Sequence, residues 1–494
     1  MVKDKNLGEK ILKGSVAVLT LTFLGSIFAY IIRIIFSRTL SVESYGLFYA
    51  VLGLFNVLTT YIDLGYGYSV VYLLPKYIRE KNYKEAWNVF IHGQTVSLSL
   101  TLLVSFLLII FAPFLSNKYF KVPGSETLIY IFCIYLISYV ILNGLIQIFA
   151  SLQQASYFAS ITVLKWLLTL LISLIFLGLG IQNILTFAVS LAVAHLLTAV
   201  IYSYLLLIKH PLLIKNKITI QKSTYKKMTA FALPAILETL VYSAVIATDT
   251  FLLTLFRGVR DVGIYNIIYP LASIPVVLFN PLNGLILPLV SHLMEGDKKR
   301  LSYLMEKILE VIPFISLYFI LFIVIFPSAI VRLIFGDQWN GLVGLPLSIL
   351  SPAGIPILMS GILGAILLGT GRVMEKLKAA SLIAVVGIIL NTFLIWKYGL
   401  LGAVITSTFV ATSLTIYFTV LLKQTIDFKV PFKFYLKIIT FGILLFVTAR
   451  LLGLNPLTWN SIISYGVIYS LLYLGLGWIL KVYDKKLLTM LLKK

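Results

Sequence analysis

The sequence predicts an all-α, polytopic membrane protein with about 14 transmembrane helices, arranged as two parallel-repeat six-helix bundles and two C-terminal helices. Of its 494 residues, 60% are hydrophobic and only 12% are charged, with a mean hydropathy of +1.02. Soluble domains are about 45–50% apolar and about 25% charged. The apolar residues gather into long runs, and the basic residues gather in alternate gaps between them. This composition excludes a soluble enzyme, a disordered chain and a nucleic-acid-binding protein.

Fourteen apolar runs can be read along the chain, and a transmembrane helix needs about 20 such residues. The first run follows a basic start and is longer than a signal-peptide core, so we expect an uncleaved anchor. The runs cover roughly 13–37, 46–74, 87–114, 126–149, 156–179, 183–208, 228–256, 262–290, 308–334, 342–369, 379–398, 400–422, 434–453 and 459–480.

Lysine and arginine are unevenly distributed between the gaps. When basic residues near the end of a run are counted with the adjacent gap, 30 of the 40 belong to one set of alternate gaps and eight to the other, and two lie well inside runs. Short cytoplasmic loops concentrate Lys and Arg, so we expect a multi-pass protein of the cytoplasmic membrane with both termini in the cytoplasm. The net charge of +22 then reflects topology and contact with anionic lipid head groups.

The chain shows signs of an internal duplication. Residues 44–51 resemble 261–268, which pairs Gly46 with Gly263, and Gly144 pairs with Gly361 at the same offset of 217. Two bundles joined by a linker are typical of secondary transporters, and a scaffold without transport is the alternative. The predicted domains are an N-terminal six-helix bundle, a basic cytoplasmic linker, a C-terminal six-helix bundle and helices 13 and 14, at 1–208, 209–227, 228–424 and 425–494.

Proline is distributed differently in the two halves. The four prolines before residue 228 lie at run ends or in loops, whereas seven in the second half fall inside runs. Because proline removes a backbone donor and kinks a helix, the second bundle is predicted to be the more bent one.

Three stretches carry a pattern of a known family. An arginine, Arg38, precedes Tyr45–Gly46, a Leu-Pro pair opens the seventh run, and Asp249 stands ahead of the segment 262–265. The stretches are 33–51, 233–271 and 398–408. In these features the chain resembles polysaccharide (O-antigen, Wzx-type) flippases of the multidrug/oligosaccharidyl-lipid/polysaccharide (MOP) exporter superfamily.

This resemblance implies a secondary transporter that flips a lipid-linked oligosaccharide, a polyprenyl-type phosphate sugar, from the inner to the outer leaflet by alternating access. It implies a role in cell-surface polysaccharide biosynthesis. The implied partners are the lipid-linked oligosaccharide, membrane lipids and polysaccharide-assembly enzymes, with no nucleic acid. No cofactor is expected apart from a coupling ion, H⁺ or Na⁺.

Other functions remain open at this point. A drug/cation antiporter and a peptidoglycan-lipid flippase belong to the same superfamily, and a membrane glycosyltransferase or polymer ligase is the alternative from another class. Such enzymes usually need a long acidic outer loop, and the predicted outer loops are short. No filter-like motif indicates a channel, and no GxxxxGK[ST] phosphate loop indicates a primary pump. No catalytic residue and no metal site is predicted, and the single cysteine, Cys133, lies in an apolar run.

Five ionisable residues lie well inside runs. Each would cost about 2.5–3.5 kcal/mol at the bilayer centre, so they should face a hydrated cleft or one another. Arg33 and Lys165 are the candidates for binding the substrate phosphate, because a cation binds it directly. A static ion pair of Lys165 with Asp63 or Glu238 is the alternative. The five are Arg33, Asp63, Lys165, Glu238 and Asp249.

The three acidic residues are candidates for gating and ion coupling. Arg33 and Asp249 both lie near the outer ends of their runs and are hypothesised to pair as an outer gate; the alternative is a snorkelling arginine and a helix-capping aspartate. Asp63 and Glu238 are candidates for proton or sodium coupling, with interhelical hydrogen bonding as the alternative. Polar neighbours of Asp63 are candidate sugar contacts: Thr59, Thr60, Tyr61 and Tyr66.

Overall fold

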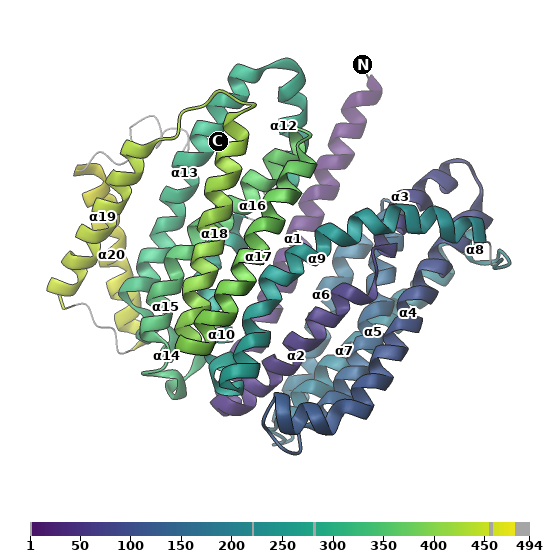
Figure 1. The fold of residues 1–494 in the computed structure, drawn as a ribbon, viewed down its shortest axis with the longest axis horizontal. Helices are drawn as coiled ribbons and strands as arrows, with labels where there is room; N and C mark the ends of the chain where they lie inside the picture. The colour runs from purple at the N-terminus through teal and green to yellow at the C-terminus, as the bar shows by residue number, and fades with distance from the viewer. Residues whose placement is uncertain (1, 220–221, 280–282, 454–457, 480–494) are drawn as a thin grey trace. The chain divides into compact units, whose positions relative to one another are not determined.

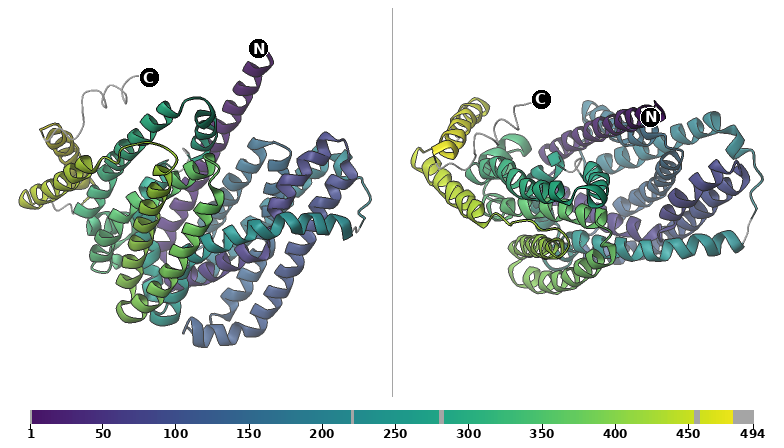
Figure 2. Two further views of the ribbon diagram at one scale, coloured as in Figure 1. Left: turned by 45° about the horizontal axis from the view of Figure 1, so that its top comes forward. Right: turned by 90° about the horizontal axis from the view of Figure 1, so that it is seen from above.

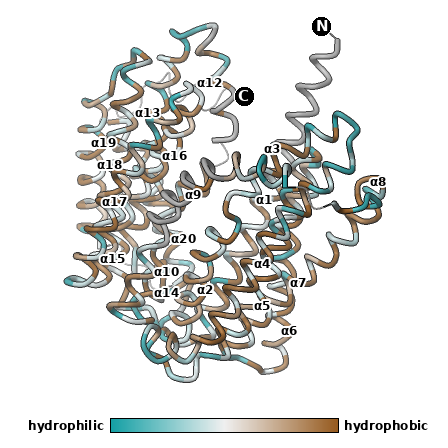
Figure 3. Tube along the Cα trace, turned by 45° about the vertical axis from the view of Figure 1, so that its right-hand side comes forward, coloured by the Kyte–Doolittle hydropathy of each residue, from teal (hydrophilic) through white to brown (hydrophobic). Residues whose placement is uncertain are grey.

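Every element described in the computed structural model is a helix, which confirms the all-α class (Figure 1). Twelve helices in the described part are long and apolar enough to cross a membrane. The multi-pass membrane character is therefore confirmed, and the number fourteen stays a prediction. Figure 3 shows that the helices α4, α5, α6 and α7 are hydrophobic along most of their length. The structure describes residues 2–219, 222–279, 283–453 and 458–479, and within these the backbone alone at 2–17, 19, 233–235, 237–247, 283–285, 287, 288 and 295.

The chain forms two compact units, Met1–Gly263 and Ile264–Lys494. Their division falls inside one helix and not in the basic loop 209–227. The predicted domain boundaries describe a duplication in the sequence, whereas the two units are defined by their compactness. The boundaries therefore stay a prediction.

The first unit is built around the long apolar helices that follow its N-terminus. The helix α1 packs on α6, and α5 contacts α4, α6 and α7. Fully buried side chains of α3, α4 and α5, among them Leu74, Val89 and Phe149, form its core. The helices are α1 (Val2–Thr39), α2 (Val42–Ile62), α3 (Tyr66–Arg79), α4 (Tyr83–Phe114), the π-helical turn η1 (Leu115–Tyr119), α5 (Glu126–Ser151), α6 (Ala155–Gly178), α7 (Ile184–Lys209), α8 (Pro211–Ile214), α9 (Lys222–Arg257) and the start of α10 (Val259–Ala272).

Helix starts in this unit are fixed by side-chain caps. Ser41 accepts a hydrogen bond from the Ser44 backbone N–H (3.2 Å), and Asn183 accepts one from Thr186 N–H (2.8 Å). Such caps satisfy backbone donors that have no partner within the helix. They separate α2 from α1 and α7 from α6.

The apolar run 46–74 is not one helix. The helix α2 ends at Ile62, and α3 begins at Tyr66. Leu64 and Gly65 between them have φ of 45° and 76°, in the left-handed region that glycine tolerates best. The expectation of a single span here was wrong, because hydropathy stays high through a turn that two residues are enough to make.

The glycines paired by the predicted duplication meet in the structure. A Cβ atom on Gly46 would lie 1.9 Å from the carbonyl oxygen of Val259, and one on Gly263 would lie 2.9 Å from that of Val42. Val42 and Val259 are also separated by the offset of 217. The starts of α2 and α10 therefore contact each other backbone to backbone in a reciprocal way.

The second unit contains the helices from the end of α10 to α20. Its core joins α12, α13, α16 and α18 through apolar side chains such as Met305, Ile362, Ile366 and Leu422, all fully buried. The elements after α10 are α11 (Ile274–Phe279), α12 (Asn283–Gly296), α13 (Lys298–Ile325), α14 (Pro327–Phe335), η3 (Asp337–Trp339), α15 (Gly344–Leu350), η4 (Ser351–Ala353), α16 (Gly354–Gly369), α17 (Val373–Tyr398), α18 (Leu400–Lys423), α19 (Phe432–Leu451) and α20 (Trp459–Ile479).

The last two described helices form a pair against α13. The hydroxyl of Tyr469 donates to the carbonyl of Tyr318 (2.6 Å), and that of Tyr473 donates to the carbonyl of Phe314 (2.7 Å). Figure 2 shows the yellow α19 and α20 beside each other. These two hydrogen bonds hold α20 against α13 within the second unit.

Candidate functional site

The break between α2 and α3 places a carboxylate at the start of a helix. Asp63 is the residue after α2, and its Oδ2 accepts a hydrogen bond from the Gly67 backbone N–H at 3.1 Å. This N–H is one of those left without a partner in the first turn of α3. A helix N-terminus also favours a nearby negative charge. The turn therefore holds Asp63 within the helical bundle of the first unit.

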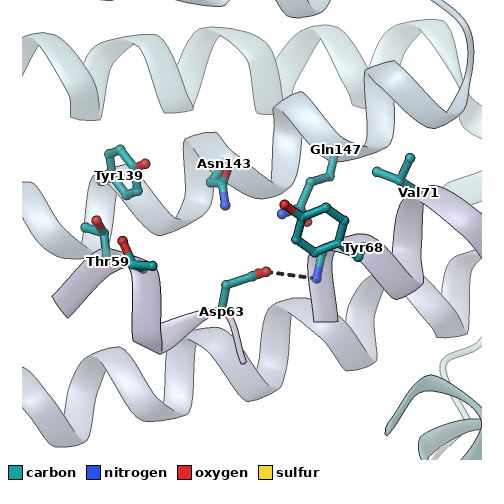
Figure 4. Close-up of a pocket in the computed structure, with 9 residues that line it drawn as sticks. Thr59, Asp63, Tyr68, Val71, Tyr139, Asn143 and Gln147 are labelled. Atoms are coloured by element: carbon teal, nitrogen blue, oxygen red, sulfur yellow. Dashed lines mark hydrogen bonds between the residues drawn. The ribbon is translucent and has the colours of Figure 1, made fainter. Parts of the chain in front are cut away.

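A cavity of about 360 Å³ opens beside this carboxylate (Figure 4). Side chains from α2, α3 and α5 surround it, and Figure 4 shows Tyr139, Asn143 and Gln147 facing Asp63 from the neighbouring helix. Hydroxyl and amide groups supply most of its polar atoms, and Tyr68 is 59% exposed. The lining residues are Thr59, Thr60, Asp63, Gly67, Tyr68, Val71, Tyr139, Asn143 and Gln147.

A smaller compartment of about 10 Å³ continues from the same carboxylate toward α4. Gln94 and Ser97 of α4 line it together with Asp63, Asn143 and Gln147. Ser97 and Gln147 also interact with the Asp63 side chain.

Two glycines make room for the amide groups of this site. A Cβ atom on Gly144 would lie 1.0 Å from Nε2 of Gln94, and one on Gly67 would lie 2.0 Å from Nε2 of Gln147. Both positions therefore need glycine if the two amides are to stay where they are.

The four candidate sugar contacts divide into two groups. Thr59 and Thr60 line the cavity, and their hydroxyls donate to the carbonyl of Asn56 at 2.8 and 3.2 Å. Tyr61 and Tyr66 are not among its lining residues, and the Tyr66 hydroxyl hydrogen-bonds with that of Thr229 (2.9 Å).

Sequence reasoning missed the contribution of α4 and α5 to the site. Tyr139, Asn143 and Gln147 recur every four residues in an otherwise apolar helix, a spacing that puts them on one face. That spacing was visible in the sequence and could have found them. That Gln94 of α4 lines the same compartment as Asp63 depends on tertiary packing and could not have been found in this way.

The other candidate charges of the first unit lie outside this cavity. Cζ of Arg33 lies 4.5 Å from the centroid of the Tyr49 ring, a cation–π distance. Asp249, on α9, is buried, with 5% of its surface exposed. Their pairing as an outer gate stays a prediction. Glu238 is also in α9, and its side chain lies outside the described residues.

Lys165 lies among aromatic rings on α6. Its Nζ is 5.5 Å from the centroid of the Trp166 ring, and no ion pair joins it to an acidic side chain that the structure describes. The alternative of a pair with Asp63 is therefore not realised, whereas one with Glu238 is outside the described residues. The neighbouring His195 is buried between Tyr135 and Trp166.

Solved structures with a similar fold are membrane transporters. "Lipid II flippase MurJ, inward closed conformation" matches with a TM-score of 0.70 at 15% identity, over 98% of this chain and 100% of that one. An inward-facing multidrug resistance MATE family transporter of the MOP superfamily matches with a TM-score of 0.69 at 14% identity, over 83% of this chain and 98% of that one. A MOP superfamily transporter from Pyrococcus furiosus matches with a TM-score of 0.59 at 15% identity, over 83% and 95%.

The chain is therefore a polytopic membrane protein that shares its fold with transporters of the MOP superfamily. A model of the family described as "Polysaccharide biosynthesis protein" matches residues 11–294. The chain belongs to this family, which confirms the resemblance noted in the sequence. An uncharacterized membrane protein of Methanocaldococcus jannaschii is 26% identical over 483 residues, covering 94% of both chains.

Proposed function

We propose that the protein flips a lipid-linked oligosaccharide, a polyprenyl-type phosphate sugar, from the inner to the outer leaflet of the cytoplasmic membrane for cell-surface polysaccharide biosynthesis. Family membership and a fold shared with a lipid II flippase support this function. The observation that carries it is the cavity of about 360 Å³ lined by hydroxyl, amide and tyrosine side chains. The hydroxyl and amide groups of this lining can donate to and accept from the hydroxyl groups of a sugar.

In this mechanism the protein performs no bond chemistry. The sugar passes through the polar interior while the lipid stays in the bilayer, and alternating access exposes the interior to each side in turn. Lys165 and Arg33 bind the phosphate as cations, and Thr59 and Thr60 contact the sugar. Both termini lie in the cytoplasm, and polysaccharide-assembly enzymes supply and consume the substrate.

Reconstitution tests this function directly. Purified protein in liposomes should bring a polyprenyl-pyrophosphate oligosaccharide to the outer surface, where a lectin captures it, while Lys165→Ala should slow this transfer at least about tenfold. The matched control is Lys217→Ala, which removes an exposed lysine of the loop 209–227. Three other results would contradict this function. Transfer of lipid II alone would indicate a peptidoglycan-lipid flippase, and efflux of a cationic dye would indicate a drug/cation antiporter. Transfer of sugar to an acceptor would indicate a glycosyltransferase or polymer ligase.

Topology can be tested with single cysteines. The only natural cysteine, Cys133, is buried, so Cys133→Ala gives a background without thiols. In that background an impermeant maleimide added to whole cells should label Asn117→Cys and leave Lys217→Cys unlabelled. The opposite pattern would invert the proposed orientation.

A further inference from the structure

The cavity of about 360 Å³ is lined by one acidic side chain and by no basic one. Among its nine described lining residues, only Asp63 is acidic or basic. The sequences of α2 and α5 contain no Lys or Arg, and the two basic residues of α3, Lys76 and Arg79, are in its last turn and outside the lining. Arg33 and Lys165, the candidates for binding phosphate, also lie outside it. An anion in this cavity would therefore meet a carboxyl group and no cation.

This lining disfavours a negatively charged ligand for two reasons. Transfer of a carboxylate or phosphate out of water is strongly unfavourable when no cation pairs with it, and the Asp63 carboxylate adds repulsion between like charges. A hydroxyl group meets neither penalty, because it exchanges its hydrogen bonds with water for hydrogen bonds with the lining. The charge of the lining therefore discriminates between neutral and anionic sugars.

Hydrogen-bonding groups of the lining remain available to a ligand. No hydrogen bond joins the Asn143 amide or the Tyr68 hydroxyl to the other residues drawn in Figure 4. The hydroxyls of Thr59 and Thr60 donate to the carbonyl of Asn56 at 2.8 and 3.2 Å, which leaves their oxygens free to accept. The cavity thus offers both donors and acceptors, and a sugar hydroxyl both donates and accepts.

Tyr68 adds an aromatic surface to these polar groups. It is 59% exposed although it lines the cavity. A tyrosine ring has an apolar face and a polar tip, so it can pack against the C–H face of a pyranose while amide groups bind the hydroxyl groups at the edge. The volume of about 360 Å³ is at the lower end of the range of about 300–1,000 Å³ for ligand pockets. The cavity therefore suits a short part of an oligosaccharide.

We propose that this cavity is a sugar subsite that selects uncharged sugar units and rejects units that carry a carboxylate or a phosphate. Asn143 is its hydrogen-bonding group and Tyr68 its packing surface. Negative groups of a substrate bind elsewhere in the protein, in agreement with the assignment of the phosphate to Lys165 and Arg33. That the selection acts on the transported lipid-linked sugar rests on the proposed function, whereas the selection itself depends only on the cavity.

Binding of soluble oligosaccharides to the purified full-length protein tests this selection. The probes are a panel of oligosaccharides that contain glucuronic acid, each paired with its carboxyl-reduced form, in which the carboxylate has become a primary alcohol. The two members of a pair share length and linkages and differ in charge. In nanodiscs of zwitterionic lipid, the wild type should bind the reduced forms at least about tenfold more tightly, because the anion has no cation to pair with.

A pair of identical substitutions separates the cavity from the rest of the protein. Asn143→Lys places a cation in the lining and should abolish or reverse the preference for the reduced forms. The matched control Asn117→Lys adds the same charge at an exposed position of the first unit outside the lining and should keep the wild-type preference. Tyr68→Ala should weaken binding of the reduced forms by about threefold to tenfold. If Asn143→Lys does not fold, Thr60→Lys places the cation in the same lining.

Three results would overturn the proposal. These are equal or tighter binding of the glucuronate forms by the wild type, an unchanged preference in a folded lysine variant of the cavity, and no binding of either form. The probes carry no lipid and no transport is measured, so failure of this subsite and failure of the proposed function are separate results. A protein that flips the lipid-linked sugar in liposomes but binds no soluble sugar would keep the function and lose the subsite.

Discussion

The two units interrupt their apolar helices in chemically different ways. In the first unit, the break between α2 and α3 uses Leu64 and Gly65 and lies next to the cavity beside Asp63. In the second unit, breaks occur at proline-bearing segments, with Pro327 at the start of α14 and Pro352 in η4. A glycine turn frees backbone donors that a carboxylate can accept from, whereas proline lacks the donor altogether.

The same contrast is seen in the helices around these breaks. At the predicted repeat offset of 217, Asn143 and Gln147 of α5 correspond to Ser360 and Gly364 of α16. The α5 residues line the cavity, whereas α16 contributes Leu358, Ile362 and their neighbours to an apolar core. The two corresponding helices are thus filled differently, one with polar side chains beside a cavity and the other with apolar side chains in a core.

The largest expected effect concerns the charges of the first unit. Arg33→Asp and Asp249→Arg should each abolish export of the lipid-linked sugar, because each would place like charges at the hypothesised outer gate. The double swap should recover part of the activity. The measurement is export in liposomes or in a flippase-deficient strain, with protein level as a control. Full activity of Arg33→Asp alone would disprove the gate.

The next largest effect falls on the stability of the second unit. Arg372 hydrogen-bonds to Glu375, to Thr425 (2.9 Å) and Gln424 (2.6 Å), and to the carbonyl of Leu421. It thereby ties the start of α17 to the end of α18. Arg372→Ala should destabilise the protein by about 1.5–3 kcal/mol, as measured by thermal unfolding in detergent.

The control for this prediction lies on the same helix. Lys378 is exposed, and Lys378→Ala should change stability by no more than about 0.5 kcal/mol. Equal effects of the two substitutions would show that Arg372 contributes only charge and no specific contacts.

A smaller effect of opposite sign is expected for a matched pair of glycines. Gly144→Ala should destabilise by about 1 kcal/mol through overpacking against Gln94. At Gly364 a Cβ atom would meet Lys376 and Phe418 at 3.4 Å, an ordinary contact. Gly364→Ala should therefore stabilise by up to about 1 kcal/mol, because alanine is the better helix former. Thermal unfolding of both variants would contradict the comparison if Gly144→Ala were the more stable one.

The smallest effect is expected at a surface ion pair of the first unit. Arg260 lies 3.8 Å from Glu43, and their side chains are 59% and 61% exposed. Solvent screens such pairs, so Arg260→Ala should change stability by less than about 0.5 kcal/mol and leave export intact. A larger loss would show that this pair, and not the inner charges, holds the starts of α2 and α10 together.

Composition and spacing were sufficient to predict the membrane class, because about 20 apolar residues in a row have few alternatives to a spanning helix. The sequence pattern around Tyr45–Gly46 and Asp249 was sufficient to predict the family. Helix interruptions were harder, since the turn at Leu64 and Gly65 lies inside continuous hydropathy.

The site was predictable only in part. Asp63, Thr59 and Thr60 were found because polar residues within an apolar run are costly. The α4 contribution was not found, because Gln94 and Asp63 come to line one compartment only after α2, α4 and α5 have packed. Residue spacing predicts which side chains share one face of a helix, whereas a cavity depends on how three helices pack together.

The reciprocal contact of Gly46 with Val259 and of Gly263 with Val42 has a consequence for how this sequence can diverge. Both partners at each point are main-chain atoms, so no complementary side-chain change can compensate for a methyl group added at either glycine. A substitution of one glycine cannot be compensated by a substitution of the other. The close backbone contact therefore requires glycine at both positions, although 217 residues separate them in the chain.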